Sequence, residues 1–274
     1  MTIFQSIILG IVQGITEFVP ISSSGHLVLT PFLLRWEMPA AEAFIFKILV
    51  QVASLLAVFA YFRTDLFNIT SAFIKGIWER QPLATNEGRM GWYILLATIP
   101  AGGVGFFLQD DVESAFGSPI SASLFLFITA FLLIVAEKWG KQNRTIKNFS
   151  WIDALTMGCF QILAIFPGVS RSGATITGGM VRNFDRTTAA RFSFLMSIPI
   201  MLAAGALTLV DFLSMPNQAE LLPSFIPGFI ASAISGYLAI RWLLAFLTRY
   251  PLLIFAIYCS IFGLVNLCLA LSGH

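Results

Sequence analysis

Two short polar segments interrupt an otherwise apolar chain, and each carries side chains that could act on a phosphate group. The first holds Gln13 and Glu17, followed by the stretch 20–26 with three serines before a glycine and His26. Residues four apart lie on one face of a helix, so the amide and the carboxylate would point the same way. A carboxylate, the Ser23 hydroxyl and an imidazole are groups used in nucleophilic and acid–base catalysis.

The second polar segment, 167–175, offers a guanidinium in place of the acid. Arg171 is surrounded by small and hydroxyl-bearing residues, namely Gly168, Ser170, Ser172 and Thr175. The planar fork of an arginine binds phosphate in bidentate fashion. A turn that opens into a helix adds backbone N–H donors and the positive end of the helix dipole. We interpret this segment as a phosphate-binding loop.

The two polar segments are related by a constant offset of 148 residues. The offset pairs Gln13 with Gln161, Phe18 with Phe166, Ser22 with Ser170, Ser24 with Ser172, and Gly25 with Gly173. Such self-similarity favours an internal duplication. The copies differ where chemistry would need them to differ, because Glu17 pairs with Ile165 and Ser23 pairs with Arg171.

The composition indicates a protein embedded in a membrane. Of the 274 residues, 57% are hydrophobic and only 11% are charged, too few to coat a soluble protein of this size. The formal net charge of +2 is too small to suggest a nucleic-acid partner. We therefore expect an all-α, multi-pass integral membrane protein that forms a single domain, residues 1–274.

Six apolar stretches are long enough to cross a bilayer: 43–62, 91–109, 119–137, 189–211, 224–243 and 251–271. Segments 4–35 and 152–182 are also apolar but are broken in the middle by Pro, Ser and Gly. Broken backbone at membrane depth must be buried in protein or line a wet cavity, so we predict two re-entrant helix–loop–helix segments. Halves 1–137 and 149–271 would each contain one re-entrant segment and three spans. Since three is odd, the halves form an inverted repeat with the site at the breaks.

The charges of the connecting segments predict the orientation. Lys and Arg gather in 63–90, 138–150 and 241–250, whereas the charged residues of 110–118 and 212–223 are all acidic. By the positive-inside rule the basic segments face the cytoplasm. Both termini would then lie outside.

Structural explanations compete with catalytic ones for each of these side chains. Buried hydroxyls in membrane helices usually serve packing, and Glu17 with Arg171 could form a structural ion pair. Ionisable groups inside a membrane are costly, however, and mark functional sites by default. Their position on two related loops strengthens the functional interpretation.

Three motifs together resemble the bacterial undecaprenyl-diphosphatase family of the bacitracin-resistance type. The family's [E/Q]-x-x-x-E motif corresponds to residues 13–17, its Ser-Ser-x-Gly-His stretch to 22–26, and its Pro-Gly-x-Ser-Arg-Ser-x-x-Thr motif to 167–175. The motifs occur in order, and the resemblance covers essentially the whole chain.

The resemblance implies removal of the terminal phosphate from undecaprenyl diphosphate in the bacterial cytoplasmic membrane. This reaction recycles the carrier lipid for peptidoglycan synthesis and confers bacitracin resistance. The expected partners are the polyprenyl diphosphate, membrane lipids and a second copy of the chain as a homodimer.

On this basis we hypothesise a role for each candidate. Ser23 is the nucleophile, His26 is the general base or acid, and Glu17 holds Mg²⁺ or Ca²⁺. Arg171 stabilises the transferring phosphoryl group. The substrate-binding residues would be Gln13, Ser22, Gly168, Ser170, Ser172 and Thr175. A water nucleophile activated by Glu17 or His26 is an open alternative.

Other functions are weighed against this one. The inverted repeat is also typical of transporters, so a polyprenyl-phosphate flippase is the main alternative. A lipid receptor would not need the acid, hydroxyl and imidazole. A two-histidine lipid phosphatase is excluded because His26 and His274 are the only histidines.

Overall fold

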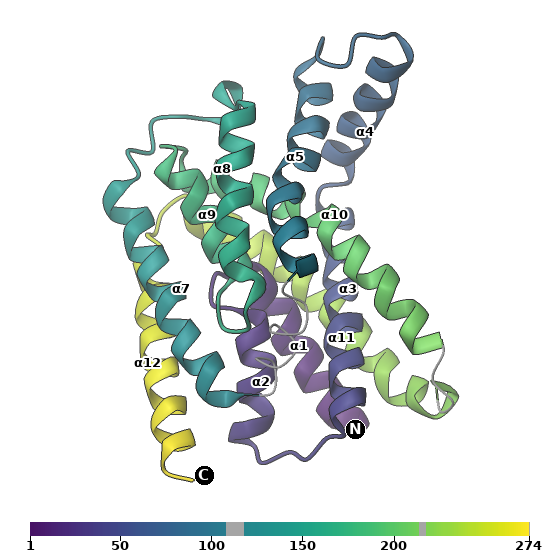
Figure 1. The fold of residues 1–274 in the computed structure, drawn as a ribbon, viewed down its shortest axis with the longest axis vertical. Coiled ribbons are helices and arrows are strands. Elements are labelled where there is room, and N and C mark those ends of the chain that lie inside the picture. The colour runs from purple at the N-terminus through teal and green to yellow at the C-terminus, as the bar shows by residue number, and fades with distance from the viewer. Residues whose placement is uncertain (108–117, 214–217, 274) are drawn as a thin grey trace.

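The structure, a computed structural model, describes residues 1–107, 118–213 and 218–273, and this part of the chain is built of helices (Figure 1). The first half contains α1 (Ile3–Phe18), α2 (Ser23–Leu33), α3 (Ala40–Tyr61), α4 (Arg63–Trp78), α5 (Asn86–Phe107) and α7 (Pro119–Trp139). The second half contains η1 (Ile146–Asn148), α8 (Trp151–Ile162), η2 (Leu163–Ile165), α9 (Arg171–Val181), α10 (Arg186–Leu213), α11 (Gln218–Leu247) and α12 (Leu253–Leu271). The all-α prediction is confirmed.

Several helices are long and apolar enough to cross a membrane. Among the described residues, α5, α7, α10, α11 and α12 meet this condition, and a sixth span results if α3 and α4 are counted as one bent pair. Each predicted span coincides with one helix, although the end of 91–109 and most of 110–118 lie outside the described residues. The fold is that of a multi-pass membrane protein.

A segment that was predicted to connect two spans contains a helix. Segment 63–90 contains α4, which leaves the axis of α3 at an angle of 84°. Leu66 and Ile69 pack against the main hydrophobic core, while Phe67 and Trp78 on other faces of α4 are exposed. This amphipathic pattern predicts a helix, and the sequence analysis missed it because the basic residues dominated the interpretation.

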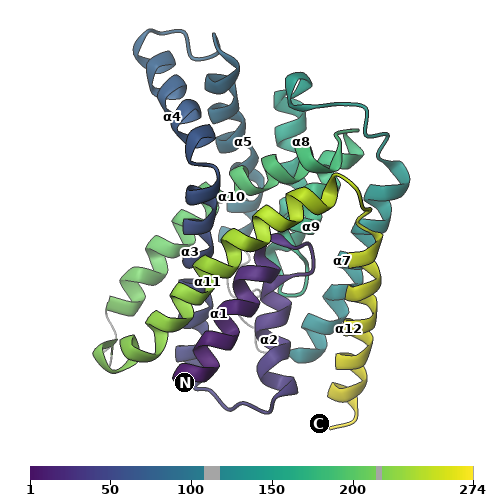
Figure 2. The same ribbon diagram turned by 180° about the vertical axis from the view of Figure 1, so that it is seen from behind.

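Each broken segment packs along a long helix from the other half of the chain. α1 lies against α11, and α8 lies against α5 (Figure 2). Small residues permit the close approach. A Cβ atom on Gly10 would lie 2.1 Å from the carbonyl oxygen of Gly228, and one on Gly158 would lie 2.5 Å from that of Ala97. The two breaks are thereby held at the centre of the molecule.

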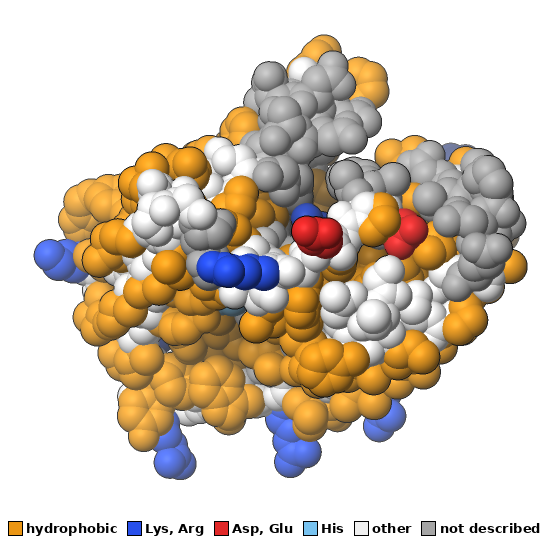
Figure 3. All heavy atoms as spheres, turned by 90° about the horizontal axis from the view of Figure 1, so that it is seen from below, with side chains coloured by type: hydrophobic (Ala, Val, Ile, Leu, Met, Phe, Trp, Pro, Cys, Tyr) orange, Lys and Arg blue, Asp and Glu red, His pale blue; other side chains and the backbone are white. Residues whose placement is uncertain are grey.

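The two ends of the molecule differ in their charged groups. Both termini lie at one end, whose surface shows mainly hydrophobic side chains and few charged ones (Figures 1 and 3). The opposite end holds a buried ionic network around Asp153, in the first turn of α8. Arg144 donates to both Asp153 carboxylate oxygens at 2.9 and 2.8 Å, and Arg182 Nε donates at 2.7 Å. This network ties the 140–150 connection to α8 and α9.

The same contacts set the protonation of Asp153. Burial alone would raise the pKa of this carboxyl, but the hydrogen bonds from Arg144, Ser150 and Arg182 outweigh burial and lower the pKa to about 2. Because the folded-state pKa lies below the ordinary value, the stabilisation is complete above about pH 4 and is lost as the pH falls toward about 2.

We expect Asp153→Asn to lower the free energy of unfolding by about 3 kcal/mol at neutral pH, because two guanidinium groups lose their buried counter-ion. Thermal unfolding in detergent measures this change. Between about pH 6 and about pH 3, the wild type should lose more stability than the variant. Glu79→Gln is the matched control, since its 3.8 Å pair with Lys75 is exposed and contributes little. Equal unfolding temperatures for wild type and Asp153→Asn would contradict the assignment.

Candidate active site

The helices that follow the two breaks, α2 and α9, begin in the same way. Ser22 and Ser170 are their N-caps, and each side-chain oxygen accepts a hydrogen bond from the backbone N–H three residues later, at 3.2 and 3.0 Å. The first helical residues are therefore Ser23 and Arg171. Equivalent capping thus places a hydroxyl at one helix start and a guanidinium at the other.

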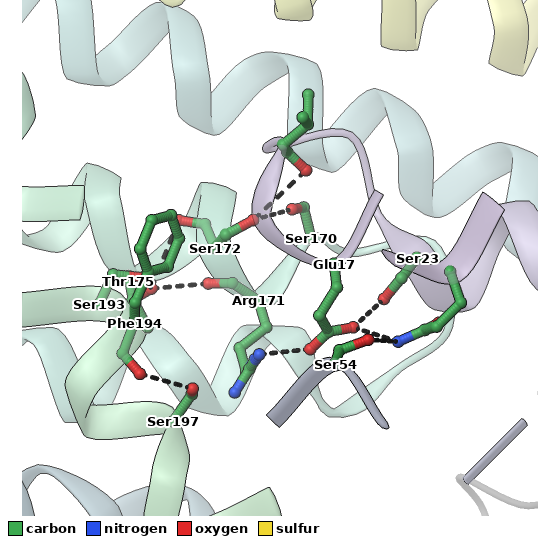
Figure 4. A network of polar contacts seen from close by, with 12 residues as sticks. Glu17, Ser23, Ser54, Ser170, Arg171, Ser172, Thr175, Ser193, Phe194 and Ser197 are labelled. Atoms are coloured by element: carbon green, nitrogen blue, oxygen red, sulfur yellow. Dashed lines mark hydrogen bonds and ion pairs between the residues drawn. The ribbon is translucent and has the colours of Figure 1, made fainter. Parts of the chain in front are cut away.

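Glu17, near the end of α1, connects these two helix starts (Figure 4). Its Oε2 accepts hydrogen bonds from Ser23 Oγ at 2.6 Å and from Gln13 Nε2 at 2.8 Å. Its Oε1 accepts a charge-assisted hydrogen bond from Arg171 Nη2. The structure therefore brings three other predicted site residues onto the carboxylate of Glu17, a residue that is 5% exposed.

Gln13 also links this group to α3. Its Nε2 lies 3.4 Å from the hydroxyl oxygen of Ser54, which in turn lies 3.0 Å from the hydroxyl of Ser232 on α11 (Figure 4 shows Ser54). Gln13 therefore has two roles: it bridges helices and it orients Glu17.

The two terminal nitrogens of the Arg171 guanidinium differ in their hydrogen bonding. Its Nη2 is bound to Glu17, while Nη1 is buried and has no hydrogen-bond partner among the described residues. A buried donor without an acceptor costs free energy, and a guanidinium with an open N–H group fits a phosphate oxygen. This nitrogen is the clearest sign of an anionic ligand.

A cavity of about 360 Å³ lies beside the Glu17–Arg171 pair. Its polar lining consists of Gln13, Glu17, Ser23, Ser24, Lys47, Gln51 and Arg171. Its apolar lining consists of Leu27, Ile48, Ala101, Gly105, Ala164, Ile165, Val169, Ile200 and Ala204. A charged region next to apolar walls suits an amphiphilic ligand with a polar head.

Three hydroxyls of the second polar segment bond to other protein groups and do not line the cavity. Ser170 and Ser172 share a hydrogen bond at 3.1 Å, and Ser172 also lies 3.5 Å from the carbonyl oxygen of Val19. Thr175 Oγ1 lies 2.6 Å from Ser193 Oγ on α10 (Figure 4). None of the three is part of the described cavity lining. They tie α9 to its neighbours and hold Arg171 in place.

Gly168 and Ser22 shape the two turns. Gly168 has φ 106°, and Ser22, outside the cavity lining, has φ 73°; both values lie in the region that L-residues other than glycine rarely adopt. The Gly168 N–H donates to Ser24 Oγ at 3.3 Å, which joins one turn to the other. Strained backbone of this kind is typical of functional loops.

His26 is turned away from Ser23. Its Nδ1 lies 2.7 Å from the Ser22 carbonyl oxygen and its Nε2 lies 2.7 Å from the hydroxyl of Tyr258 on α12. The ring stacks on Phe262 with centroids 4.6 Å apart. A carbonyl oxygen only accepts, so Nδ1 carries the proton and Nε2 accepts from Tyr258. Neither nitrogen is free to take a proton from Ser23 in this arrangement.

Sequence reasoning missed Lys47, Gln51 and Tyr258. Lys47 and Gln51 interrupt the apolar stretch 43–62, and an ionisable residue inside a span is a functional candidate by default. That signal was present and could have identified Lys47. No sequence signal links Tyr258 to His26, because the contact depends on the tertiary packing of α12.

The site offers limited support for a divalent cation. Over the described ranges no cluster of three or more His, Cys, Asp or Glu could hold a metal. Glu17 is the only acidic residue in the described cavity lining, and Gln13 and Ser23 add neutral oxygen atoms. Mg²⁺ in particular is often bound by one or two carboxylates together with substrate phosphates. The residues fit such an ion when a phosphate ligand supplies further oxygens.

Comparison with known proteins places the chain in a well-populated group. Residues 6–265 match the family model described as bacitracin resistance protein BacA. The undecaprenyl-diphosphatase of Chlorobaculum tepidum is 41% identical, with 100% of this chain and 99% of the relative covered. Those of Thermomicrobium roseum (40% identical; 97% and 98% covered) and Myxococcus xanthus (38%; 100% and 91%) are similar over comparable lengths.

We expect Gly168→Ala to lower the free energy of unfolding by at least about 2 kcal/mol. The added Cβ would lie 2.4 Å from the Ala122 carbonyl oxygen, on a backbone with positive φ. Gly103→Ala is the control, because no heavy atom lies within 4 Å of its Cβ and alanine favours the helix. Denaturation in detergent compares the two. A Gly168→Ala protein as stable as the control would show that the turn is not constrained as described.

Proposed function

The chain belongs to the bacitracin resistance protein BacA family, and from this membership we infer that it is an undecaprenyl-diphosphatase. It hydrolyses undecaprenyl diphosphate to undecaprenyl phosphate and inorganic phosphate, which returns the carrier lipid to peptidoglycan synthesis. One observation carries the chemistry: a hydroxyl 2.6 Å from a carboxylate borders a cavity that also holds a guanidinium with an open nitrogen.

Ser23 is the nucleophile in this proposal, and Glu17 is its base. Glu17 Oε2 already accepts the Ser23 hydrogen bond, which is the nucleophile–base geometry expected for covalent catalysis. As Ser23 Oγ forms a bond to the terminal phosphorus, its proton moves to Glu17. The bridging P–O bond breaks, and the lipid monophosphate leaves with the electron pair.

Arg171 binds the phosphoryl group during this step. Its open Nη1 can reach a phosphate oxygen without losing the contact of Nη2 with Glu17. The guanidinium then neutralises charge on the transferring group, the main demand of phosphoryl transfer. Being the first residue of α9, it acts next to the positive end of a helix dipole.

Water completes the reaction. Glu17 first releases its proton through the cavity and then takes one from the attacking water. The water oxygen bonds to phosphorus, and the bond from phosphorus to Ser23 Oγ breaks. Glu17 then gives the proton it took from water to Ser23 Oγ. Inorganic phosphate leaves, and the Ser23–Glu17 hydrogen bond forms again.

Glu17 would also be the protein ligand for Mg²⁺ or Ca²⁺, with the Gln13 side-chain oxygen nearby. Such an ion, when bound, neutralises phosphate charge. The remaining ligands would come from the substrate and water. Chelation should therefore weaken substrate binding more than it affects the fold.

We also propose that the two halves, 1–137 and 149–271, form an inverted repeat with two re-entrant segments. In support, α2 and α9 begin 148 residues apart with the same capping, and α1 and α8 each pack on a helix of the other half. α1 and α8, with 16 and 12 residues, are too short to cross a bilayer. α4 has no counterpart in the second half.

The proposed location is the bacterial cytoplasmic membrane, with both termini outside. Arg144 and Arg182 lie at the end of the molecule opposite the termini, and by the positive-inside rule that end faces the cytoplasm. The cavity residues of α3 lie in its first half, which begins at the same end as the chain termini (Figure 1). Substrate would then enter from the outer side.

Purified protein in detergent should release phosphate from undecaprenyl diphosphate, and Ser23→Ala should abolish that release while the lipid still binds. Ser24→Ala should retain most of the activity, because Ser24 loses only neutral hydrogen bonds to Gly168 and Ser22. A phosphate-release assay with a parallel binding measurement checks both variants. A flippase would release no phosphate in detergent, and more than a tenth of wild-type activity in Ser23→Ala would favour a water nucleophile.

We further propose that His26 positions Ser23 instead of exchanging its proton. Its Nδ1–H holds the carbonyl of Ser22, the residue with positive φ directly before the nucleophile. His26→Asn keeps a side-chain N–H near that carbonyl, whereas His26→Ala removes it. We expect the Asn variant to keep at least a tenth of kcat and the Ala variant to lose roughly 100-fold, a loss of positioning. A general base at His26 would instead leave both variants equally inactive, and the Asn variant would not retain the wild-type pH profile.

A further inference from the structure

α3 presents a polar stripe to the site. Lys47, Gln51 and Ser54 are spaced at i, i+4 and i+7, which places them on one face of the helix. Ser54 lies within hydrogen-bonding distance of Gln13, so this face is the one that meets the Glu17 network. Lys47 and Gln51 line the same cavity as Glu17 and Arg171.

The spacing along α3 separates Lys47 from the contact between Ser54 and Gln13. Lys47 is two helical turns from Ser54, about 10 Å along the axis of α3. It lies toward the start of α3, the end of the molecule that carries both termini (Figure 1). The ammonium group therefore belongs to a part of the cavity beyond the Ser54–Gln13 contact.

The charged residues of the described cavity lining indicate which kind of ligand Lys47 could bind. Two cations, Arg171 and Lys47, and one anion, Glu17, border the cavity. Arg171 is already paired with Glu17. A diphosphate carries two adjacent phosphate groups, so one cation near Glu17 and another further along the cavity match its charge distribution.

We propose that Lys47 binds the phosphate group that stays on the lipid. This inference rests on the proposed phosphatase function. When the bond between the terminal phosphorus and the bridging oxygen breaks, negative charge develops on that oxygen and its phosphate. The Lys47 ammonium stabilises this charge, while Arg171 holds the terminal group that Ser23 attacks.

The assignment makes Lys47 a specificity residue for diphosphates. A prenyl diphosphate engages Arg171 and Lys47 together, whereas a prenyl monophosphate has one phosphate and engages only one of them. Leu27 and Ile48 add apolar walls to the same cavity, which suit the prenyl chain of such a ligand.

The test uses the full-length protein in detergent with Lys47→Met and Lys47→Arg. Two quantities are measured: kcat/KM for undecaprenyl diphosphate, and the Kd of farnesyl methylenediphosphonate, a prenyl diphosphate analogue that cannot be hydrolysed. We expect Lys47→Met to weaken both by roughly 10- to 100-fold, the effect of removing one charge-assisted hydrogen bond. Lys47→Arg should stay within a few-fold of wild type. Farnesyl monophosphate should bind the wild type and Lys47→Met with more similar affinity than the diphosphonate does.

Lys75→Met is the matched control, because Lys75 is an exposed residue of α4 paired with Glu79. Loss of the Lys47 charge favours membrane insertion, and thermal unfolding in detergent checks that the variant is folded. Wild-type kcat/KM and diphosphonate affinity in Lys47→Met would overturn the inference. If the wild type released no phosphate, the proposed function would fail. The diphosphonate affinities would still decide whether Lys47 is a diphosphate ligand.

Discussion

The ion pair between Glu17 and Arg171 is the interaction on which the site depends. It joins the end of one broken helix to the start of another, although the two residues are 154 positions apart. A buried ion pair contributes little net stability, because desolvation offsets the attraction. Its value lies in geometry: Glu17 is oriented so that Oε2 receives Ser23, and Nη1 of Arg171 is left without a hydrogen-bond partner among the described residues.

The two turns have matching helix caps but carry different side chains, so together they provide the groups of one site. Ser22 and Ser170 cap α2 and α9 in the same way, so the backbone places the next residue equivalently. In the proposed mechanism one next residue, Ser23, attacks the phosphorus, and the other, Arg171, holds the phosphate. The matching caps supply the positions, and two differences between the segments, Ser23 against Arg171 and Glu17 against Ile165, supply the asymmetry that the proposed phosphoryl transfer requires.

Much of this arrangement could be predicted from the sequence, because it depends on local signals. Apolar length predicted the spans, and the Pro, Ser and Gly residues inside two apolar segments predicted the breaks. Tertiary packing decided the remainder. The ring of His26 is held by Tyr258, 232 residues away, and the hydroxyl of Thr175 bonds to Ser193 on α10. Spacing alone cannot tell a hydroxyl that faces a ligand from one that faces a helix. Lys47 was detectable as a charge in an apolar stretch, yet only the fold brings it to the cavity.

The central claim is that Ser23, activated by Glu17, attacks the terminal phosphorus. The stereochemical course of the reaction tests it most directly, using undecaprenyl diphosphate whose terminal group is made chiral by sulfur and oxygen isotopes. Attack by serine and then by water gives two in-line displacements, and the account predicts retention of configuration in the released thiophosphate. Inversion would mean a single displacement by water and would contradict the account.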